Sequence, residues 1–361
     1  MKMKKLEIKY DDLIQNINTI KNICGNSKII AVLKGNGYGL GITQFAEVLL
    51  ENQIDFFAVS ELDEAEILRG TGFNNEILLL SPTINKEEAE KIASLSITAA
   101  VGSVDSARVL SETGVKTKAH IKIDTGFGRF GFHINELDEA ANQLKSFENI
   151  EYSGVFSHFS NSFGKKIESS KKQFDLFMSA VERLNSLGIN PEIRHICNSC
   201  GALRFDFARL DAVRIGSAFL GRLPVENTFG LKRIAHLKCS ISEIRTLPKG
   251  SNVGYADTYK TKRDTKIAII PVGYKDGFGV EKSRDTFRFM DILRYIYGDV
   301  FSLGKKLYVG INGKNVPIIG RISMYNIIAD VTDVDAKPGD TVILECNPIL
   351  IDSSIKREYC K

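Results

Sequence analysis

The strongest constraint on the fold is the alternation, through the first 220 residues, of short apolar segments with longer amphipathic ones. Between the apolar segments, Leu13, Ile17, Ile20 and Cys24 illustrate the helical spacing that places side chains on one face. The apolar segments predict eight strands: residues 28–33, 56–59, 77–80, 97–101, 119–123, 154–156, 193–196 and 212–215. Strands joined by helices pair in parallel, and a count of eight favours an α/β fold closed as a (β/α)8 barrel.

The pattern changes after about Gly221. Strand-like segments joined by Gly, Pro and Asp turns follow one another without helices between most of them, at residues 236–244, 266–272, 306–311, 315–319 and 327–331. Residues 281–305 differ, because they mix apolar and charged residues as an amphipathic helix with one packed face does. We therefore expect two domains, a barrel over residues 1–230 and a mainly β domain over residues 231–361.

Charge and hydropathy exclude several classes of partner. The chain of 361 residues carries 48 basic and 44 acidic residues, a net charge of +4, without long blocks of one sign. Nothing in this balance favours a nucleic acid or a membrane surface as the main partner. The basic N-terminus lacks a secretory apolar stretch, and no run of about 18 apolar residues occurs, so we expect a cytoplasmic protein.

The six cysteines are scattered through a chain large enough to fold without disulfides, which predicts reduced thiols. Cys197 and Cys200 have CxxC spacing, but no second CxxC or His pair completes a metal shell. We therefore expect no metal site.

Polar residues follow several of the predicted strands, where barrel enzymes carry their functional groups. Lys34 follows the first strand and opens a turn with four glycines within seven residues, which lets the backbone approach a ligand closely. The other residues at strand ends are His158, Asn198, Ser199, Arg214, Gly216 and Ser217. Any one of them alone fits a packing or ion-pairing role, but together at one rim they favour an anionic, phosphorylated ligand. Lys34 is then placed to bond covalently to a carbonyl cofactor.

These residues lie in motifs that resemble the pyridoxal phosphate (PLP)-dependent alanine racemases. The similar segments run in the family's order over nearly the whole chain: 34–39 (KGNGYG), 122–131 (KIDTGFGRFG), 157–159 (SHF), 195–199 (HICNS), 211–216 (DAVRIG), 253–255 (VGY), 272–277 (VGYKDG) and 320–324 (GRISM). The resemblance implies a homodimeric racemase that interconverts L- and D-alanine, with a small-molecule amino-acid substrate and PLP as cofactor.

The resemblance also implies two opposed bases. Lys34 would hold PLP and exchange a proton on one face of the substrate, and Tyr255 of the partner subunit would serve the other face. A phenol with a pKa of about 10 needs help to act as a base, and the family supplies it through His158 and Arg214. An arginine opposite the pyridine nitrogen keeps that nitrogen unprotonated, which limits side reactions such as transamination.

The remaining roles implied by the family concern binding. Tyr38, Asn198, Ser199, Gly216 and Ser217 would surround the phosphate. Arg129, Met324 and Tyr274 would contact the substrate or line its access, and Lys122, carbamylated in some members, would support Arg129.

Three departures put the substrate in question. Tyr325 stands where most members have Asp, the segment at 347–359 is shortened, and 281–305 is an apparent insertion. The alternatives are a racemase of serine, lysine or arginine, a non-catalytic PLP-binding protein, and a barrel-type PLP decarboxylase. A non-catalytic carrier would end after the barrel, and the glycine-rich triplet of the decarboxylases is missing.

Overall fold

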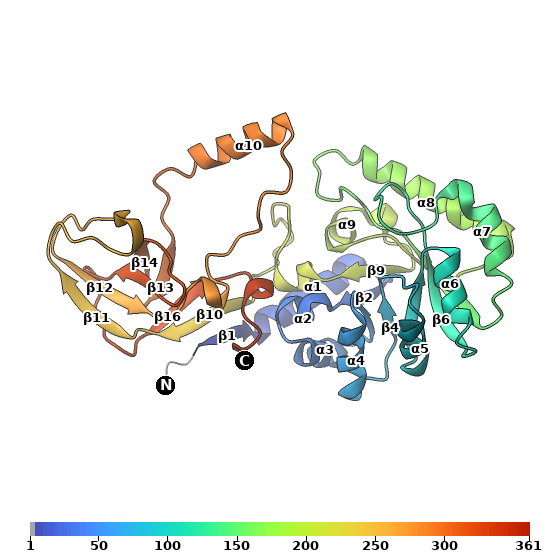
Figure 1. Ribbon diagram of the computed structural model, residues 1–361, viewed down its shortest axis with the longest axis horizontal. Helices are drawn as coiled ribbons and strands as arrows, with labels where there is room; N and C mark the ends of the chain where they lie inside the picture. The colour runs from blue at the N-terminus through green and yellow to red at the C-terminus, as the bar shows by residue number, and fades with distance from the viewer. Residues whose placement is uncertain (1–3) are drawn as a thin grey trace. The chain divides into compact units, whose positions relative to one another are not determined.

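A computed structural model describes residues 4–361, and the contacts between its Cα atoms divide the chain into two units (Figure 1). The first unit is Tyr10–Ile234. The second combines Ala235–Lys361 with the first strand, β1 (Lys5–Lys9).

Eight parallel strands form the sheet of the first unit. Their order is β8-β7-β6-β5-β4-β3-β2-β9. The strands are β2 (Lys28–Val32), β3 (Phe56–Val59), β4 (Ile77–Leu79), β5 (Thr98–Val101), β6 (Thr117–Lys122), β7 (Ile150–Phe156), β8 (Ile193–His195) and β9 (Ala212–Ile215). The backbone N–H of Arg214 donates to the Cys197 carbonyl at 3.0 Å, which brings the two outer strands together into a nearly closed barrel. The predicted α/β barrel and all eight predicted strands are confirmed.

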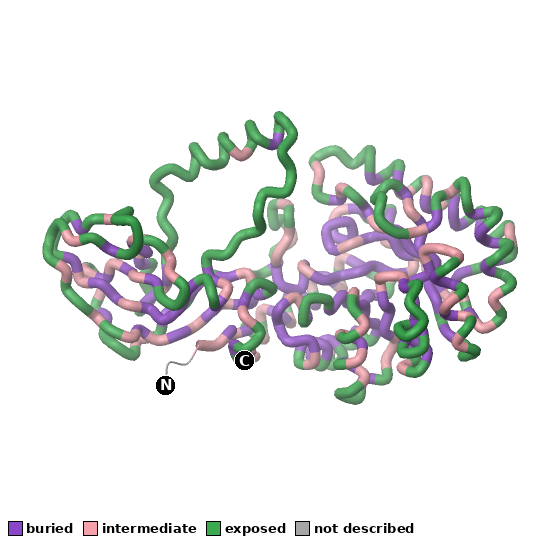
Figure 2. The backbone as a smooth tube through the Cα atoms, viewed as in Figure 1, coloured by how far each residue is buried: buried purple, intermediate pink, exposed green. Residues whose placement is uncertain are grey.

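The helical segments of this unit lie between its strands in sequence. They are α1 (Tyr10–Cys24), α2 (Lys34–Tyr38), α3 (Ile42–Glu51), α4 (Leu62–Gly70), α5 (Lys86–Ser94), α6 (Val104–Ser111), α7 (Leu137–Leu144), α8 (Glu168–Ser186) and α9 (Ser199–Arg204). In α1, Leu13, Ile17, Ile20 and Cys24 are buried, so the apolar stripe read from the sequence faces the core. Figure 2 shows the strands of the barrel mostly buried and the outer helix surfaces exposed.

The second unit is built on a nine-stranded sheet of order β11-β12-β15-β14-β13-β16-β10-β1-β17. Its strands after β1 are β10 (Ala235–Ser240), β11 (Glu243–Leu247), β12 (Thr265–Ile270), β13 (Tyr308–Ile311), β14 (Lys314–Ile319), β15 (Ile327–Asp330), β16 (Thr341–Glu345) and β17 (Lys356–Cys360). The mainly β character expected after the barrel is therefore present.

Two details of this unit differ from expectation. The sequence-based division placed residues 1–230 in the barrel, but β1 pairs antiparallel with β10 and parallel with β17, so it joins the β unit; residues 1–3 of that range lie outside the described part. The segment 236–244 was expected to be one strand. It is broken between β10 and β11 because β10 pairs with β16 whereas β11 pairs with β12.

The insertion 281–305 contains the expected helix, α10 (Phe289–Val300), but the expected packed face is absent. From residue 281 to 308 only Asp291 is buried and only Tyr295 is half-buried (Figure 2). The charged residues pair within the insertion itself, as Arg284 with Asp299 and both Arg288 and Arg294 with Asp291. No helix of residues 4–361 is long and apolar enough to cross a membrane.

Candidate active site

Lys34 begins a left-handed turn that follows the first strand of the barrel. Gly35, Asn36 and Gly37 have φ of 64°, 55° and 64°, a conformation open mainly to Gly and, less readily, to Asn. The Glu64 carboxylate fixes this turn by accepting the backbone N–H groups of Gly35 at 2.6 Å and Asn36 at 3.3 Å. The glycine-rich sequence is therefore needed to shape the turn that carries Lys34.

The surroundings of Lys34 lower its pKa. Burial against the barrel is the largest cause, although the residue stays accessible at the mouth of the pocket, and the charge of Arg129 adds to it. Glu64 acts in the opposite direction but does not reverse the shift. A larger fraction of this amine is therefore neutral, and so nucleophilic, than for an ordinary lysine.

A pocket of about 440 Å³ opens beside Lys34 at the carboxyl ends of the strands. It brings together ten residues singled out in the sequence: Lys34, Tyr38, Lys122, Arg129, His158, Asn198, Ser199, Arg214, Gly216 and Ser217. Its lining contains four basic side chains, Lys34, Lys122, Arg129 and Arg214, against one carboxylate, Glu61. This excess of positive charge suits an anionic ligand.

One end of the pocket is formed by backbone and hydroxyl groups. The Ser199 hydroxyl accepts the backbone N–H of Gly216 at 2.9 Å, and Asn198 caps α9 by accepting the Gly201 N–H at 3.0 Å. A Cβ on Gly216 would lie 2.5 Å from the Tyr38 ring, so only glycine fits against that ring. Burial raises the pKa of Tyr38 to about 12, so its hydroxyl remains protonated and can donate a hydrogen bond.

Arg214 lies at the centre of the polar network. It is buried and donates to the ring nitrogens of His195 at 2.6 Å and His158 at 3.2 Å. Its other hydrogen bonds go to the backbone carbonyls of His195, Ser157 and Ile196. No carboxylate of the described chain pairs with it, so the buried charge is held by neutral acceptors.

Lys122 is buried at the end of β6, and its ammonium lies 4.7 Å from the centre of the Phe156 ring. Burial, followed by the charges of Arg214 and Arg129, lowers its pKa to about 7. The loop after it is fixed by Asp124, whose Oδ1 accepts the backbone N–H groups of Gly126 and Phe127, each at 2.9 Å. This loop carries Arg129 to the pocket lining.

Three of the expected site residues lie in the β unit and not in this pocket. Tyr255, Tyr274 and Met324 are 68%, 49% and 46% exposed. The turns that carry Tyr274 and Met324 pack closely, because the Tyr274 N–H donates to the Ser323 carbonyl at 3.1 Å and a Cβ on Gly273 would meet the Met324 carbonyl oxygen at 2.3 Å. Tyr325 is exposed beside them.

Sequence reasoning gave no role to Glu64, Glu61 or His195. Glu64 acts 29 residues away along the chain, and no local pattern connects it to the Lys34 turn. His195 opens the HICNS motif, and that position was the available signal. Its importance appears only once β8 and β9 place it against Arg214.

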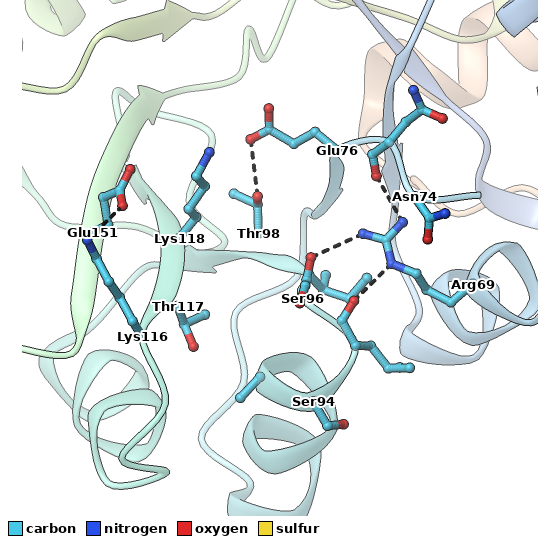
Figure 3. A pocket seen from close by; sticks show the side chains of 14 residues that line it. Arg69, Asn74, Glu76, Ser94, Ser96, Thr98, Lys116, Thr117, Lys118 and Glu151 are labelled. Atoms are coloured by element: carbon cyan, nitrogen blue, oxygen red, sulfur yellow. Dashed lines mark hydrogen bonds and ion pairs between the residues drawn. The ribbon is translucent and has the colours of Figure 1, made fainter. Parts of the chain in front are cut away.

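A larger hollow of about 780 Å³ lies at the opposite ends of the strands (Figure 3). Its arginine, Arg69, donates to the carbonyls of Phe73, Asn75, Leu95 and Ser96. Lys116 pairs with Glu151, and Glu76 accepts the Thr98 hydroxyl. These polar groups are already paired with neighbouring groups of the barrel. The smaller pocket with its basic side chains is therefore the better candidate site.

The CxxC cysteines are separate buried thiols. Cys197 and Cys200 donate to the carbonyls of Ala208 and Ser162, and burial raises the pKa of both. Over residues 4–361, no cluster of three or more His, Cys, Asp or Glu is placed to hold a metal ion.

Comparison with known proteins finds the same relatives along the whole chain. The family model for the alanine racemase N-terminal domain matches residues 8–224, and the model for the C-terminal domain matches residues 234–353. Alanine racemase 2 of Caldanaerobacter subterraneus subsp. tengcongensis is 32% identical over 350 residues, and alanine racemase of Clostridium tetani is 34% identical over 348; each alignment covers 94% of this chain and 84% of the relative. The solved alanine racemase of Clostridium difficile 630 in complex with cycloserine superposes with a TM-score of 0.84 at 27% identity, covering 99% of this chain and 97% of that one.

Proposed function

This chain belongs to the alanine racemase family, and from that premise we propose how its residues interconvert L-alanine and D-alanine. We infer that PLP is the cofactor, that Lys34 and Tyr255 are the two bases, and that two copies of the chain form the working enzyme. The observation that carries the proposal is the pocket beside Lys34, with its four basic side chains against one carboxylate.

The residues of the pocket fit PLP. The hydroxyls of Ser199, Ser217 and Tyr38 and the amide of Asn198 offer uncharged groups for a phosphate. Gly216 leaves room that a Cβ would fill. Lys34 supplies an amine of lowered pKa for the aldehyde carbon.

When bound, PLP accepts electron density from the substrate Cα–H bond. The Lys34 amine would exchange a proton with one face of the substrate α-carbon. The lowered pKa makes a larger fraction of this amine neutral at a given pH than for an ordinary lysine.

Tyr255 of a second copy serves the opposite face. The position of the His158 proton follows from Arg214: an arginine only donates hydrogen bonds, so Nδ1 of His158 accepts and Nε2 carries the proton. Burial and the charge of Arg214 lower the pKa of His158 to about 2, so this imidazole is neutral. Its Nε2–H is available to stabilise the deprotonated oxygen of Tyr255.

Arg129 binds the substrate carboxylate, and Lys122 supports it. A Lys122 amine with a pKa of about 7 is neutral in a large fraction of molecules, the form that adds carbon dioxide to give a carbamate. A carbamate would offer Arg129 a negatively charged partner. Met324 and Tyr274 of the second copy border the substrate.

Lys34→Ala tests the cofactor and the reaction together. Purified protein should show an absorbance band of bound PLP that Lys34→Ala abolishes, and the same substitution should reduce racemisation by about 10³-fold or more, since it removes a base and the attachment point. Lys28→Ala is the matched control, because Lys28 begins the same strand outside the pocket.

Chiral analysis with alanine, serine, lysine and arginine defines the substrate. Alanine should give the largest kcat/KM. A higher kcat/KM for serine, lysine or arginine would overturn the alanine assignment, and a Lys34→Ala protein that racemised at the wild-type rate would overturn the assignment of Lys34.

A further inference from the structure

Behind Arg214, away from the pocket, lies a chain of two buried imidazoles. Nη1 of Arg214 is 2.6 Å from Nδ1 of His195, and Nε2 of His195 is 2.8 Å from Nδ1 of His120. Both histidines are fully buried. Nε2 of His120 ends the chain, buried without a hydrogen-bond partner among the described residues.

These contacts determine where each proton lies. A guanidinium only donates, so Nδ1 of His195 must accept and Nε2 must carry the hydrogen. That N–H can donate only to an unprotonated Nδ1 of His120, so the His120 hydrogen is also on Nε2. Both rings are therefore neutral Nε2–H tautomers, and the unpartnered atom is a buried N–H donor.

The charges around the pair support the neutral state. Burial, then the charges of Arg214 and Lys118, lower the pKa of His120 to about 3. Burial, then Arg214, His120 and Lys122, lower the pKa of His195 well below its ordinary value. No carboxylate of residues 4–361 contacts either ring. His195, supported by His120, can therefore accept a hydrogen bond from Arg214 throughout the physiological pH range.

A glycine leaves room for the His120 ring, and a phenylalanine packs against the His195 ring. A Cβ on Gly154 would lie 2.5 Å from the His120 ring, so a glycine in β7 admits that ring. Phe156 stacks on His195 with the ring planes 2° apart and the centres separated by 5.0 Å. An unpaired buried N–H costs stability, yet the proposed reaction gives His120 no role.

We propose that His195 and His120 are positioning residues that fix Arg214 from behind through a neutral donor–acceptor chain. The hydrogen bonds of Arg214 engage both terminal nitrogens, with His195, His158 and three carbonyls as acceptors. Only the Nε–H is left over. The inference rests on the proposed function, in which Arg214 would hold the ring nitrogen of PLP, and the Nε–H is the donor left for that role.

Loss of the His195 acceptor would leave a terminal N–H of a buried cation unpaired. The guanidinium would then turn to recover a partner, and the ring nitrogen would lose its fixed donor. A ring nitrogen free to take a proton withdraws electrons more strongly, which favours transamination over simple return of the proton.

Side-chain ¹⁵N NMR of the full-length chain tests the tautomers directly. The sequence has five histidines, so the spectrum is simple. His120 and His195 should both appear as neutral Nε2–H tautomers, unchanged between about pH 5.5 and 8.5, where an ordinary histidine titrates. A hydrogen on Nδ1 of either ring, or protonation of either within this range, would refute the chain.

His195→Phe and Gly154→Ala test the function of the chain by different routes. The first removes the acceptor, and the second displaces the His120 ring without changing either imidazole. The amount of pyruvate released per alanine racemised should rise about tenfold or more in His195→Phe and severalfold in Gly154→Ala, as expected when a buried charged donor loses its partner. His195→Gln, whose amide oxygen can accept from Arg214, should restore part of the wild-type ratio.

Phe177→Leu in α8 is the control for destabilisation alone, because Phe177 is buried in the barrel unit away from the pocket lining. An unchanged pyruvate ratio in folded His195→Phe would overturn the positioning role. The NMR result does not depend on PLP or on turnover, so a wrong cofactor assignment and a wrong tautomer chain would be told apart.

Discussion

Gly216 lies against the Tyr38 ring at the end of the pocket proposed to hold the phosphate. Gly216→Ala would place a methyl group 2.5 Å from the Tyr38 ring, which must then move. We expect the apparent Kd for PLP to rise about tenfold or more and stability to fall by about 1–3 kcal/mol, the range for an overpacked site. Gly70→Ala, with nothing within 4 Å of the new methyl, is the control and should leave both unchanged. PLP titration followed by absorbance, with thermal unfolding, measures the two effects; equal affinity in both variants would contradict the close contact.

The lowered pKa of Lys34 has a pH signature. A lysine is reactive when neutral, so a lowered pKa means that its reactivity develops at lower pH than that of other lysines. Lys91 is the internal reference, because its hydrogen bond to Glu66 raises its pKa. Reductive methylation of the protein without PLP, followed residue by residue by mass spectrometry, should show Lys34 labelled with a midpoint below that of Lys91. Arg129→Gln removes a charge that lowers the Lys34 pKa and should move the Lys34 midpoint upward. No movement would mean that the charge of Arg129 does not contribute to the shift.

The sequence predicted which residues line the pocket because barrel topology places the ends of all the strands at one rim. A residue after a strand of a parallel barrel must lie at the same rim as its counterparts, so local strand prediction was enough to group Lys34, His158 and Arg214. The contacts of Glu64 and His120 depend instead on packing between residues far apart in sequence. Strand prediction does not say how close such residues lie. Their contribution could be read only from coordinates.

At the scale of elements, the strand that sequence reasoning missed shows the same limit. β1 is only five residues long and precedes the barrel directly, so its neighbours in sequence suggest the wrong unit. Its position is set by pairing with β10 and β17, more than 220 residues later. Alternation buries Leu6 and Ile8 on one face, but such a short pattern does not identify its partners.

The insertion around α10 is an element that its own unit does not hold by packing. Replacing residues 281–305 by a short Gly-Ser linker removes exposed apolar side chains and ion pairs that are internal to the segment. We expect the unfolding temperature to change by no more than about 2 °C, as for changes at an unpacked surface, and binding of a hydrophobic dye to fall. Differential scanning calorimetry and dye fluorescence measure both. Replacing the buried β14 residue Val316 by Ala is the contrasting change and should lower the unfolding temperature. A drop of similar size on removing the insertion would show that it packs against the rest of the molecule.

At the scale of the whole molecule, the two proposed bases lie in different units: Lys34 in the barrel, and Tyr255 in the β unit with its side chain exposed. The barrel unit alone contains the residues proposed to attach PLP, but the proposed reaction needs a base on each face of the substrate. If Tyr255 serves the pocket of a second copy, the complete site exists only in a dimer.

Mixing two inactive variants distinguishes a base from the partner from a base of the same chain. Lys34→Ala and Tyr255→Phe should each be nearly inactive. After equal amounts are mixed and the subunits exchanged, half of the dimers contain one copy of each variant. If Tyr255 acts across the interface, each of these mixed dimers has one site with both native residues. About one quarter of all sites should therefore regain activity, by the statistics of a twofold dimer. If Tyr255 acts on its own barrel, no site in the mixture contains both residues and activity stays at the level of the separate variants. The control is a chain with both substitutions, exchanged with wild type. If Tyr255 serves the partner's pocket, each mixed dimer has no intact site. If Tyr255 serves its own pocket, each mixed dimer keeps one intact site.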